Sequence, residues 1–115
     1  MQRDDLIRIR HMLEAGQKAV SFAADRTRGD LDQDDMLTFA LMKAIENIGE
    51  AAGKVSSESK ERFHEIPWAA IIGMRNRLIH AYDDVSRDIL WQTVTYNLPP
   101  LIQELERIIR AEASE

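Results

Sequence analysis

Apolar residues recur every three to four positions along most of the chain, and this spacing places them on one face of an α-helix. The first helix is expected from about residue 5 to residue 24, with Asp4 or Asp5 as its N-cap. Gly29 and Asp30 then mark a turn. The apolar stripe of this helix is formed by Leu6, Ile9, Leu13 and Val20.

A second helix is expected from about residue 34 to residue 55. Near its end, Gly49 and Gly53 lie four positions apart, with Ala51 and Ala52 between them. Small residues at helical spacing let another helix approach closely, so we interpret them as packing contacts without a functional role. The apolar stripe of this helix is formed by Met36, Leu37, Leu41, Ala44, Ile45, Ile48 and Ala52.

The serines between residues 56 and 59 predict the cap of a short helix over residues 57–63. Pro67 suits the first turn of a further helix, because the missing N–H of proline has no intrahelical partner there. This helix is expected to run to about His80.

The last part of the chain is also expected to be helical. It starts near Ser86, a candidate cap, and continues past Asn97 until Pro99 and Pro100 break or kink it. Residues 101–113 complete the chain with another amphipathic pattern. No segment shows the sustained alternation of a strand. The fold class predicted is therefore all-α, an up-and-down bundle of four to five main helices in one domain, residues 1–115.

Composition and charge exclude several classes of function. The 115 residues include no cysteine, which excludes disulfides and thiolate zinc sites and fits a reducing cytoplasm. The longest uncharged apolar stretch, Ile66 to Met74, is shorter than the roughly 20 residues of a membrane span, and no secretory signal is apparent. The formal charge of −5 argues against a broad nucleic-acid surface, and no DNA partner is expected. Binding or cleavage of nucleic acid would need a local cationic site.

Two patterns imitate metal sites. Aspartates alternate from Asp30 to Asp34, but a calcium loop needs glycine and glutamate at its sixth and twelfth positions, which are Asp35 and Leu41 here. Glu61 and His64 form one Glu-x-x-His, whereas a di-iron site needs two such motifs and two more carboxylates. We interpret both patterns as solvated surface charges and expect no metal site.

The segment Arg75 to Tyr82 contains most of the side chains that could take part in a reaction. On a helical wheel, Arg75 projects from the middle of the apolar stripe, whereas Arg77 lies on the opposite, polar face. Asn76 and His80 lie four positions apart and are therefore neighbours. With Tyr82 the segment gathers a guanidinium, an amide, an imidazole and a phenol, a set that can bind phosphate and move a proton.

The same residues also have a structural explanation. Arg75 could be a buried ion-pair partner of Glu46 or Glu50, and His80 could be a cation that stabilises a helix end. Spacing alone does not separate these explanations from a catalytic one.

The stretch Arg75-Asn76-Arg77-Leu78-Ile79-His80-Ala81-Tyr82 resembles the Arg-x4-His-x-Tyr motif of the HEPN superfamily, and within it the HepT toxin group. The resemblance also includes the stretch from Glu46 to Ala52, the run from Pro67 into the motif, and residues 85–101. It covers nearly the whole chain in order, and the combined pattern is more specific than Arg-x4-His alone.

The resemblance implies a metal-independent endoribonuclease, a prokaryotic cytoplasmic toxin that forms a homodimer with its two motifs facing each other across a cleft. By this resemblance, an RNA 2′-hydroxyl attacks the adjacent phosphate. His80 is the general base or acid, Arg75 binds the phosphate, and Asn76 orients His80 or the phosphate. The chain itself needs no cofactor, and the RNA, either mRNA or tRNA, is not identified.

The resemblance also implies an antitoxin, an MNT-type nucleotidyltransferase that uses ATP and magnesium to transfer AMP onto Tyr82 as O-AMP-tyrosine. The added charge and bulk would repel RNA phosphate. Asp83 and Asp84 follow directly, and they would also repel RNA unless they pair with Arg77, Arg87 or a partner's basic surface, or else mark a weak nuclease. Two alternatives remain: a non-catalytic binding or regulatory subunit of a nucleotidyltransferase, and a purely structural helical dimer.

Overall fold

The structure is a computed structural model of the chain and describes residues 1–78 and 84–113. Every regular element in these ranges is a helix, which confirms the predicted all-α class. The elements in chain order are α1 (Arg3–Ala23), α2 (Asp30–Gln33), α3 (Asp35–Gly53), α4 (Ser57–Arg62), α5 (Trp68–Leu78), α6 (Asp84–Gln92), the π-helical η1 (Thr93–Asn97) and α7 (Leu98–Ala113).

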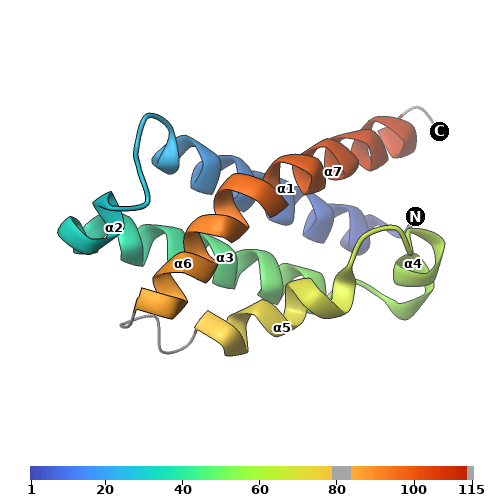
Figure 1. The fold of residues 1–115 in the computed structure, drawn as a ribbon. Helices are drawn as coiled ribbons and strands as arrows, with labels where there is room; N and C mark the ends of the chain where they lie inside the picture. The colour runs from blue at the N-terminus through green and yellow to red at the C-terminus, as the bar shows by residue number, and fades with distance from the viewer. Residues whose placement is uncertain (79–83, 114–115) are drawn as a thin grey trace.

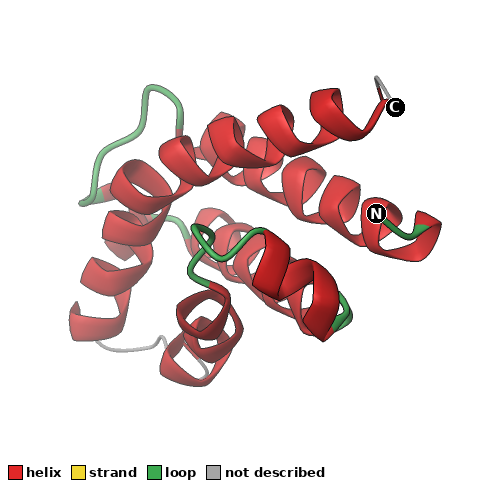
Figure 2. Ribbon diagram, turned by 90° about the vertical axis from the view of Figure 1, so that its right-hand side faces the viewer, coloured by secondary structure: helices red, strands yellow, loops and turns green. Residues whose placement is uncertain are grey.

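The helices are arranged around α3. Figure 1 shows α3 between α1 on one side and α5 on the other, and these two pairs are in extensive contact. The helix formed by α6, η1 and α7 crosses this layer, with α6 near α5 and α7 along α1. The N- and C-termini lie at the same end of the molecule (Figures 1 and 2).

The hydrophobic core draws on every long helix, and each fully buried aliphatic side chain contributes roughly 1.5–3 kcal/mol of transfer free energy. Within the described ranges, no helix is both long enough and apolar enough to cross a bilayer. The most completely buried large side chains are Ile9, Met12, Leu31, Leu41, Ile66, Leu90, Val94, Leu105 and Ile108.

The N-terminus of α1 differs from the expected cap. Gln2 occupies the N-cap position, and Asp5 is buried within the helix with 3% of its surface exposed. Asp5 accepts hydrogen bonds from Ser56 and Ser59, so this carboxylate joins α1 to α4. Ser56 also caps α4 by accepting from the Ser59 N–H at 3.2 Å, as the serine cluster predicted.

The second predicted helix is present as α3, capped by Asp34, whose side chain accepts from the Leu37 N–H at 3.1 Å. The packing interpretation of the two glycines holds for one of them. A Cβ on Gly49 would lie 3.4 Å from the Ile71 carbonyl oxygen of α5, whereas a Cβ on Gly53 would meet nothing within 4 Å. Met36 was wrongly placed in the apolar stripe: it is 83% exposed in the first turn of α3, whereas the neighbouring Leu37 is 6% exposed and faces the core.

A short helix, α2, forms where only a turn was expected. Leu31 explains its presence, because this side chain is 1% exposed and ties the segment to the core. Thr38 on α3 donates a hydrogen bond of 3.0 Å to the Leu31 carbonyl oxygen. One buried leucine within an acidic turn is too weak a pattern to predict such a helix.

The C-terminal region is one continuous helix with a kink, formed by α6, η1 and α7, rather than two separate helices. Ser86 does not cap it, because α6 already begins at Asp84. Pro99 and Pro100 do not end it either. The Leu98 N–H donates to the Thr93 carbonyl oxygen five residues earlier, and this wider π-helical turn carries the chain into the two prolines at the start of α7. The axis changes direction at this point (Figure 2), which is the kink that the prolines predicted.

Candidate functional site

The helix that carries the predicted motif is anchored at its first residue. Trp68 begins α5, is 8% exposed, and donates from Nε1 to the Phe63 carbonyl oxygen at 3.0 Å. The indole therefore fills the core and satisfies its polar atom on the turn after α4. Pro67 directly precedes this helix, where its fixed φ suits a helix start.

The buried face of α5 agrees with the wheel except at one position. Trp68 and Leu78 are buried and Ile71 is half-buried, whereas Ile72 is 37% exposed. Arg77 is exposed, which confirms its place on the polar face. The apolar stripe is thus covered along one edge and open along the other.

The predicted site residues are only partly within the described structure. The backbones of Arg75 and Asn76 lie in α5, and the helical wheel places Arg75 between Trp68 and Leu78. Their side chains lie outside the described part of the structure, as do the whole residues His80 and Tyr82. The contacts among these four residues remain a prediction, and so does the ion pair between Arg75 and Glu46 or Glu50.

Charged contacts fix the helix that returns from the motif. Arg87 Nε lies 2.9 Å from Asp32 Oδ1, and Arg28 pairs with both Asp32 and Asp88. Two residues in the first half of α6 are thereby joined to α2 and the loop before it. Asp83 and the side chain of Asp84 lie outside the described residues, so their pairing with Arg77 or Arg87 stays a prediction.

The same contacts explain the titration of these groups. The hydrogen bond from Arg28, assisted by Arg87, holds the pKa of Asp32 below its ordinary value despite some opposing desolvation. The hydrogen bond to Asp88, followed by that to Asp32, raises the pKa of Arg28. The carboxylates that imitated a calcium loop are thus ion-paired: Asp30 and Asp34 both contact Arg26. Among the described residues, no group of three or more His, Cys, Asp or Glu residues is arranged to hold a metal ion.

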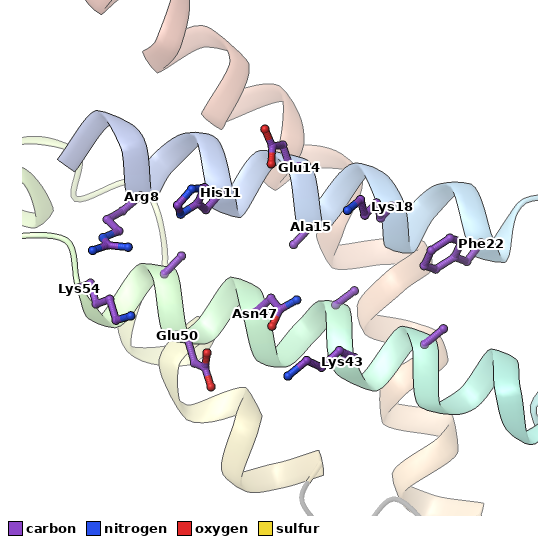
Figure 3. Close-up of a pocket in the computed structure, with 13 residues that line it drawn as sticks. Arg8, His11, Glu14, Ala15, Lys18, Phe22, Lys43, Asn47, Glu50 and Lys54 are labelled. Atoms are coloured by element: carbon purple, nitrogen blue, oxygen red, sulfur yellow. The ribbon is translucent and has the colours of Figure 1, made fainter. Parts of the chain in front are cut away.

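A groove of about 530 Å³ lies between α1 and α3 and was not predicted. Figure 3 shows Arg8, His11 and Lys18 on one wall and Lys43, Asn47 and Lys54 on the other. We call it the α1/α3 groove. The residues that line it are Arg8, His11, Glu14, Ala15, Lys18, Phe22, Ala40, Lys43, Ala44, Asn47, Glu50, Ala51 and Lys54.

The sequence contained a signal for one wall of this groove, although not for the groove itself. Arg8, His11, Ala15, Lys18 and Phe22 follow one another at steps of three, four, three and four, which defines a single helix face. Polar residues with this period are usually interpreted as a solvated surface. Only the pairing of this face with α3 turns it into one wall of a groove.

Comparison with known proteins identifies relatives of similar length. A family model described as "Ribonuclease HepT-like" matches residues 12–108. The chain is 34% identical to "Putative RNase TTE0752" of Caldanaerobacter subterraneus subsp. tengcongensis, over 90% of this chain and 96% of that protein. It is 32% identical to "Probable ribonuclease HepT" of Thermococcus cleftensis, over 94% of this chain and 98% of that protein. It is also 30% identical to "Putative RNase MJ1380" of Methanocaldococcus jannaschii, over 83% and 87% of the two chains. No solved structure matches the chain significantly.

Proposed function

The chain belongs to the ribonuclease HepT-like family, and we therefore propose that it is a metal-independent endoribonuclease that acts as the toxin of a toxin–antitoxin module. The observation that carries this proposal is the extent of the family match. Residues 12–108 include α5 and the whole of the segment from Arg75 to Tyr82. Three relatives of nearly the same length carry ribonuclease names, which supports the same activity here.

In the proposed reaction the 2′-oxygen of a ribose forms a bond to the adjacent phosphorus while the bond from phosphorus to the 5′-oxygen breaks. The products are a 2′,3′-cyclic phosphate and a free 5′-hydroxyl. His80 takes the proton of the 2′-hydroxyl or supplies the proton of the leaving oxygen, and such transfer accelerates reactions by about 10²–10⁴-fold. Arg75 binds the phosphate and stabilises its developing charge, while Asn76 orients His80 or the phosphate.

We further propose that two copies of the chain form the complete site, with the two motifs facing each other. The exposed edge of the apolar stripe supports this arrangement, because Ile72 is 37% exposed only three residues before Arg75. A second copy that covers this edge would bring two sets of cationic groups together. Two cationic sets would partly offset the formal charge of −5 on each chain.

The proposed control is chemical modification of Tyr82 by a nucleotidyltransferase antitoxin. The phenol oxygen would attack the α-phosphorus of ATP, form a phosphodiester with AMP and release pyrophosphate. The partner enzyme would supply the magnesium. The modified tyrosine would place a negative charge two residues from His80, which disfavours binding of an RNA phosphate.

Expression of the chain alone in a bacterial host tests the function. The proposal predicts growth arrest for the wild-type chain, normal growth with His80→Ala, and cleavage of a mixed-sequence RNA oligonucleotide by the purified wild-type protein in EDTA. A folded His80→Ala protein that still cleaves RNA would reject the assigned role. Absence of arrest and of cleavage by the wild type would favour a non-catalytic subunit of the nucleotidyltransferase.

A further inference from the structure

The α1/α3 groove exists because its floor is made of alanines. Ala15 on α1 and Ala44 and Ala51 on α3 are 6–7% exposed at the line where the two helices face each other. A methyl group cannot fill the space that a leucine would occupy, so the longer side chains on either side stand as the walls of a depression. The adjacent face of α1 is covered instead, because a Cβ on Gly16 would meet Ile102 of α7 at 3.2 Å and Ile48 of α3 at 3.9 Å.

The groove concentrates positive charge in an acidic protein. It contains Lys18, Lys43 and Lys54, three of the four lysines in the chain, together with Arg8. Two carboxylates, Glu14 and Glu50, also line it, so the four cations leave a formal charge of +2 with His11 neutral. Because the whole chain carries −5, the residues outside the groove together carry −7.

The groove lysines differ from the cations elsewhere in the molecule. Arg26, Arg28 and Arg107 each form ion pairs with carboxylates of the chain. Within the described residues, no ion pair joins Lys18, Lys43 or Lys54 to a carboxylate. Their ammonium groups therefore keep their hydrogen-bond donors available for a ligand.

We propose that the α1/α3 groove binds the phosphate backbone of single-stranded RNA beside the cleavage site. This inference rests on the proposed nuclease function and assigns its substrate-binding surface. Ammonium and guanidinium groups on both walls match a chain of phosphates, which are bound chiefly through such contacts.

The dimensions of the groove suit a short stretch of RNA. From Arg8 to Phe22 the lining extends over fourteen residue-to-residue steps of α1, which correspond to about 21 Å at 1.5 Å per step. Figure 3 shows Arg8 opposite Lys54 at one end, and Lys18 and Lys43 toward the end where Phe22 lies. Cations are thus present along the length of the groove, which is sufficient for a few nucleotides of an extended strand.

The groove and the helix that carries the motif lie on opposite sides of α3. The wall formed by α3 separates the groove from α5. Helices α3 and α5 approach closely at Gly49, where an added Cβ would lie 3.4 Å from the Ile71 carbonyl oxygen of α5. Figure 3 shows Glu50 on the side of α3 that faces α5, while Asn47 faces the groove. An RNA strand that leaves α5 near Arg75 needs to cross only the width of α3 to enter the groove.

Phe22 adds a contact for a base. Its ring is 44% exposed at the end of the groove, one helical turn beyond Lys18 on the same face of α1. An exposed aromatic ring beside cations is the usual arrangement for stacking a base while the adjacent phosphate is bound. The occupant that fits both features is a polynucleotide strand.

Fluorescence anisotropy with a 5′-fluorescein 2′-O-methyl oligouridylate tests the proposal. The methyl group blocks the attacking 2′-oxygen, so binding is measured without cleavage. Lys43→Gln/Lys54→Gln should weaken binding about tenfold at low salt. The same variant should reduce the slope of log K against log salt by roughly 1.4, at about 0.7 for each phosphate that a lysine no longer neutralises. Phe22→Ala should weaken binding at least about fivefold.

The matched control is Arg3→Gln/Arg10→Gln, which removes two exposed cations of α1 outside the groove and changes the charge equally. It should bind within twofold of wild type. Equal losses of affinity in the two double variants, wild-type binding by the lysine variant, or no binding by the wild type would overturn the proposal. So would a changed molar mass of the lysine variant in light scattering, which would make the groove an interface between copies.

An unmodified oligonucleotide separates this inference from the proposed function. Groove-dependent binding of the 2′-O-methyl probe without any cleavage of the unmodified strand would reject the nuclease and leave the groove as a binding site. Cleavage that is equal in wild type and Lys43→Gln/Lys54→Gln, with equal binding, would reject the groove and leave the nuclease.

Discussion

Ser59 Oγ donates a hydrogen bond of 2.6 Å to Asp5 Oδ2, although 54 positions separate the two residues in the chain. Ser56 donates to the same carboxylate from its N–H at 2.9 Å and from its Oγ at 2.6 Å. One buried carboxylate therefore receives three hydrogen bonds and holds the first turns of α1 and α4 together. Phe63 follows α4 and accepts the hydrogen bond from Trp68 Nε1, so this contact also connects α1 to the start of the motif helix.

The pKa of Asp5 determines how this contact responds to acid. Desolvation raises the pKa, but the hydrogen bonds from Ser56 and Ser59 lower it by more than desolvation raises it. The net pKa of Asp5 therefore lies below its ordinary value. The stabilisation is therefore complete above the pKa of the unfolded carboxyl, about 3.9, and is lost as the pH falls through the lower pKa of the folded state.

Asp5→Asn should reduce the free energy of unfolding by about 1–3 kcal/mol at pH 7, because a charged acceptor of three hydrogen bonds becomes neutral. Urea denaturation between pH 7 and pH 3 measures this difference. The gap between wild type and variant should stay constant down to about pH 5 and then narrow. The exposed neighbour Asp4 provides the control, and Asp4→Asn should change stability little. A gap that widens toward low pH would contradict the assignment.

The two arginines of the motif should respond differently to truncation. Arg75→Ala should lower kcat for RNA cleavage by about 10²–10³-fold, the usual cost of losing a group that stabilises transition-state charge. Arg77→Ala removes an exposed side chain on the polar face of α5 and should retain cleavage within a few-fold. Thermal melting of both variants checks their folding. A stable, active Arg75→Ala protein would show that cleavage does not need Arg75. Unfolding of Arg75→Ala with full activity of Arg75→Lys would instead give Arg75 only a structural role.

The proposed regulation through Tyr82 predicts that the mass of the chain increases when it is modified. Incubation with ATP, magnesium and the cognate nucleotidyltransferase should add one AMP group, and Tyr82→Phe should remain unmodified while still cleaving RNA. The other tyrosine, Tyr96, is 77% exposed and serves as an internal control for unspecific transfer. Peptide mass spectrometry locates the added group. Transfer to Tyr96, or no transfer with an active partner, would reject this role for Tyr82.

The two glycines of α3 should respond oppositely to larger residues. Gly53→Ala should stabilise the protein by up to about 1 kcal/mol, because a Cβ meets nothing within 4 Å and alanine favours helix. Gly49→Leu should destabilise it by about 1–3 kcal/mol, because its side chain would enter the space next to the Ile71 carbonyl oxygen. Denaturation curves of the two variants measure both changes. A tolerated leucine at residue 49 would show that α5 can move away from α3.

Helical spacing predicted the long elements well because apolar periodicity reflects the packing that forms the core. The first and second helices were expected over residues 5–24 and 34–55, and α1 and α3 occupy Arg3–Ala23 and Asp35–Gly53. Features that depend on a tertiary partner were missed. Asp5 looks like a cap until Ser56 and Ser59 fold against it, and Leu31 looks like part of a turn until the core covers it.

For the candidate site, too, features within one helix were predicted and features that depend on helix packing were missed. The local pattern identified α5, its buried face and the exposure of Arg77, all of which follow from one helix. The α1/α3 groove could not be predicted, because Lys18 and Lys43 belong to different helices and become neighbours only through helix packing. The relative positions of Arg75 and His80 depend on residues outside the described structure and remain a prediction.

The π-helical turn at Thr93–Asn97 makes the number of residues in this segment as important as their identity. Leu90 before this turn and Leu98 and Leu105 after it all face the core, at 0–3% exposure. A turn closed by i→i+5 bonding holds one residue more than an α-helical turn, so the loss of one exposed residue here leaves a segment that closes as ordinary α-helix. Leu98 and Leu105 would then keep facing the core. A one-residue deletion within this turn should therefore be less damaging than the same deletion in the middle of α7.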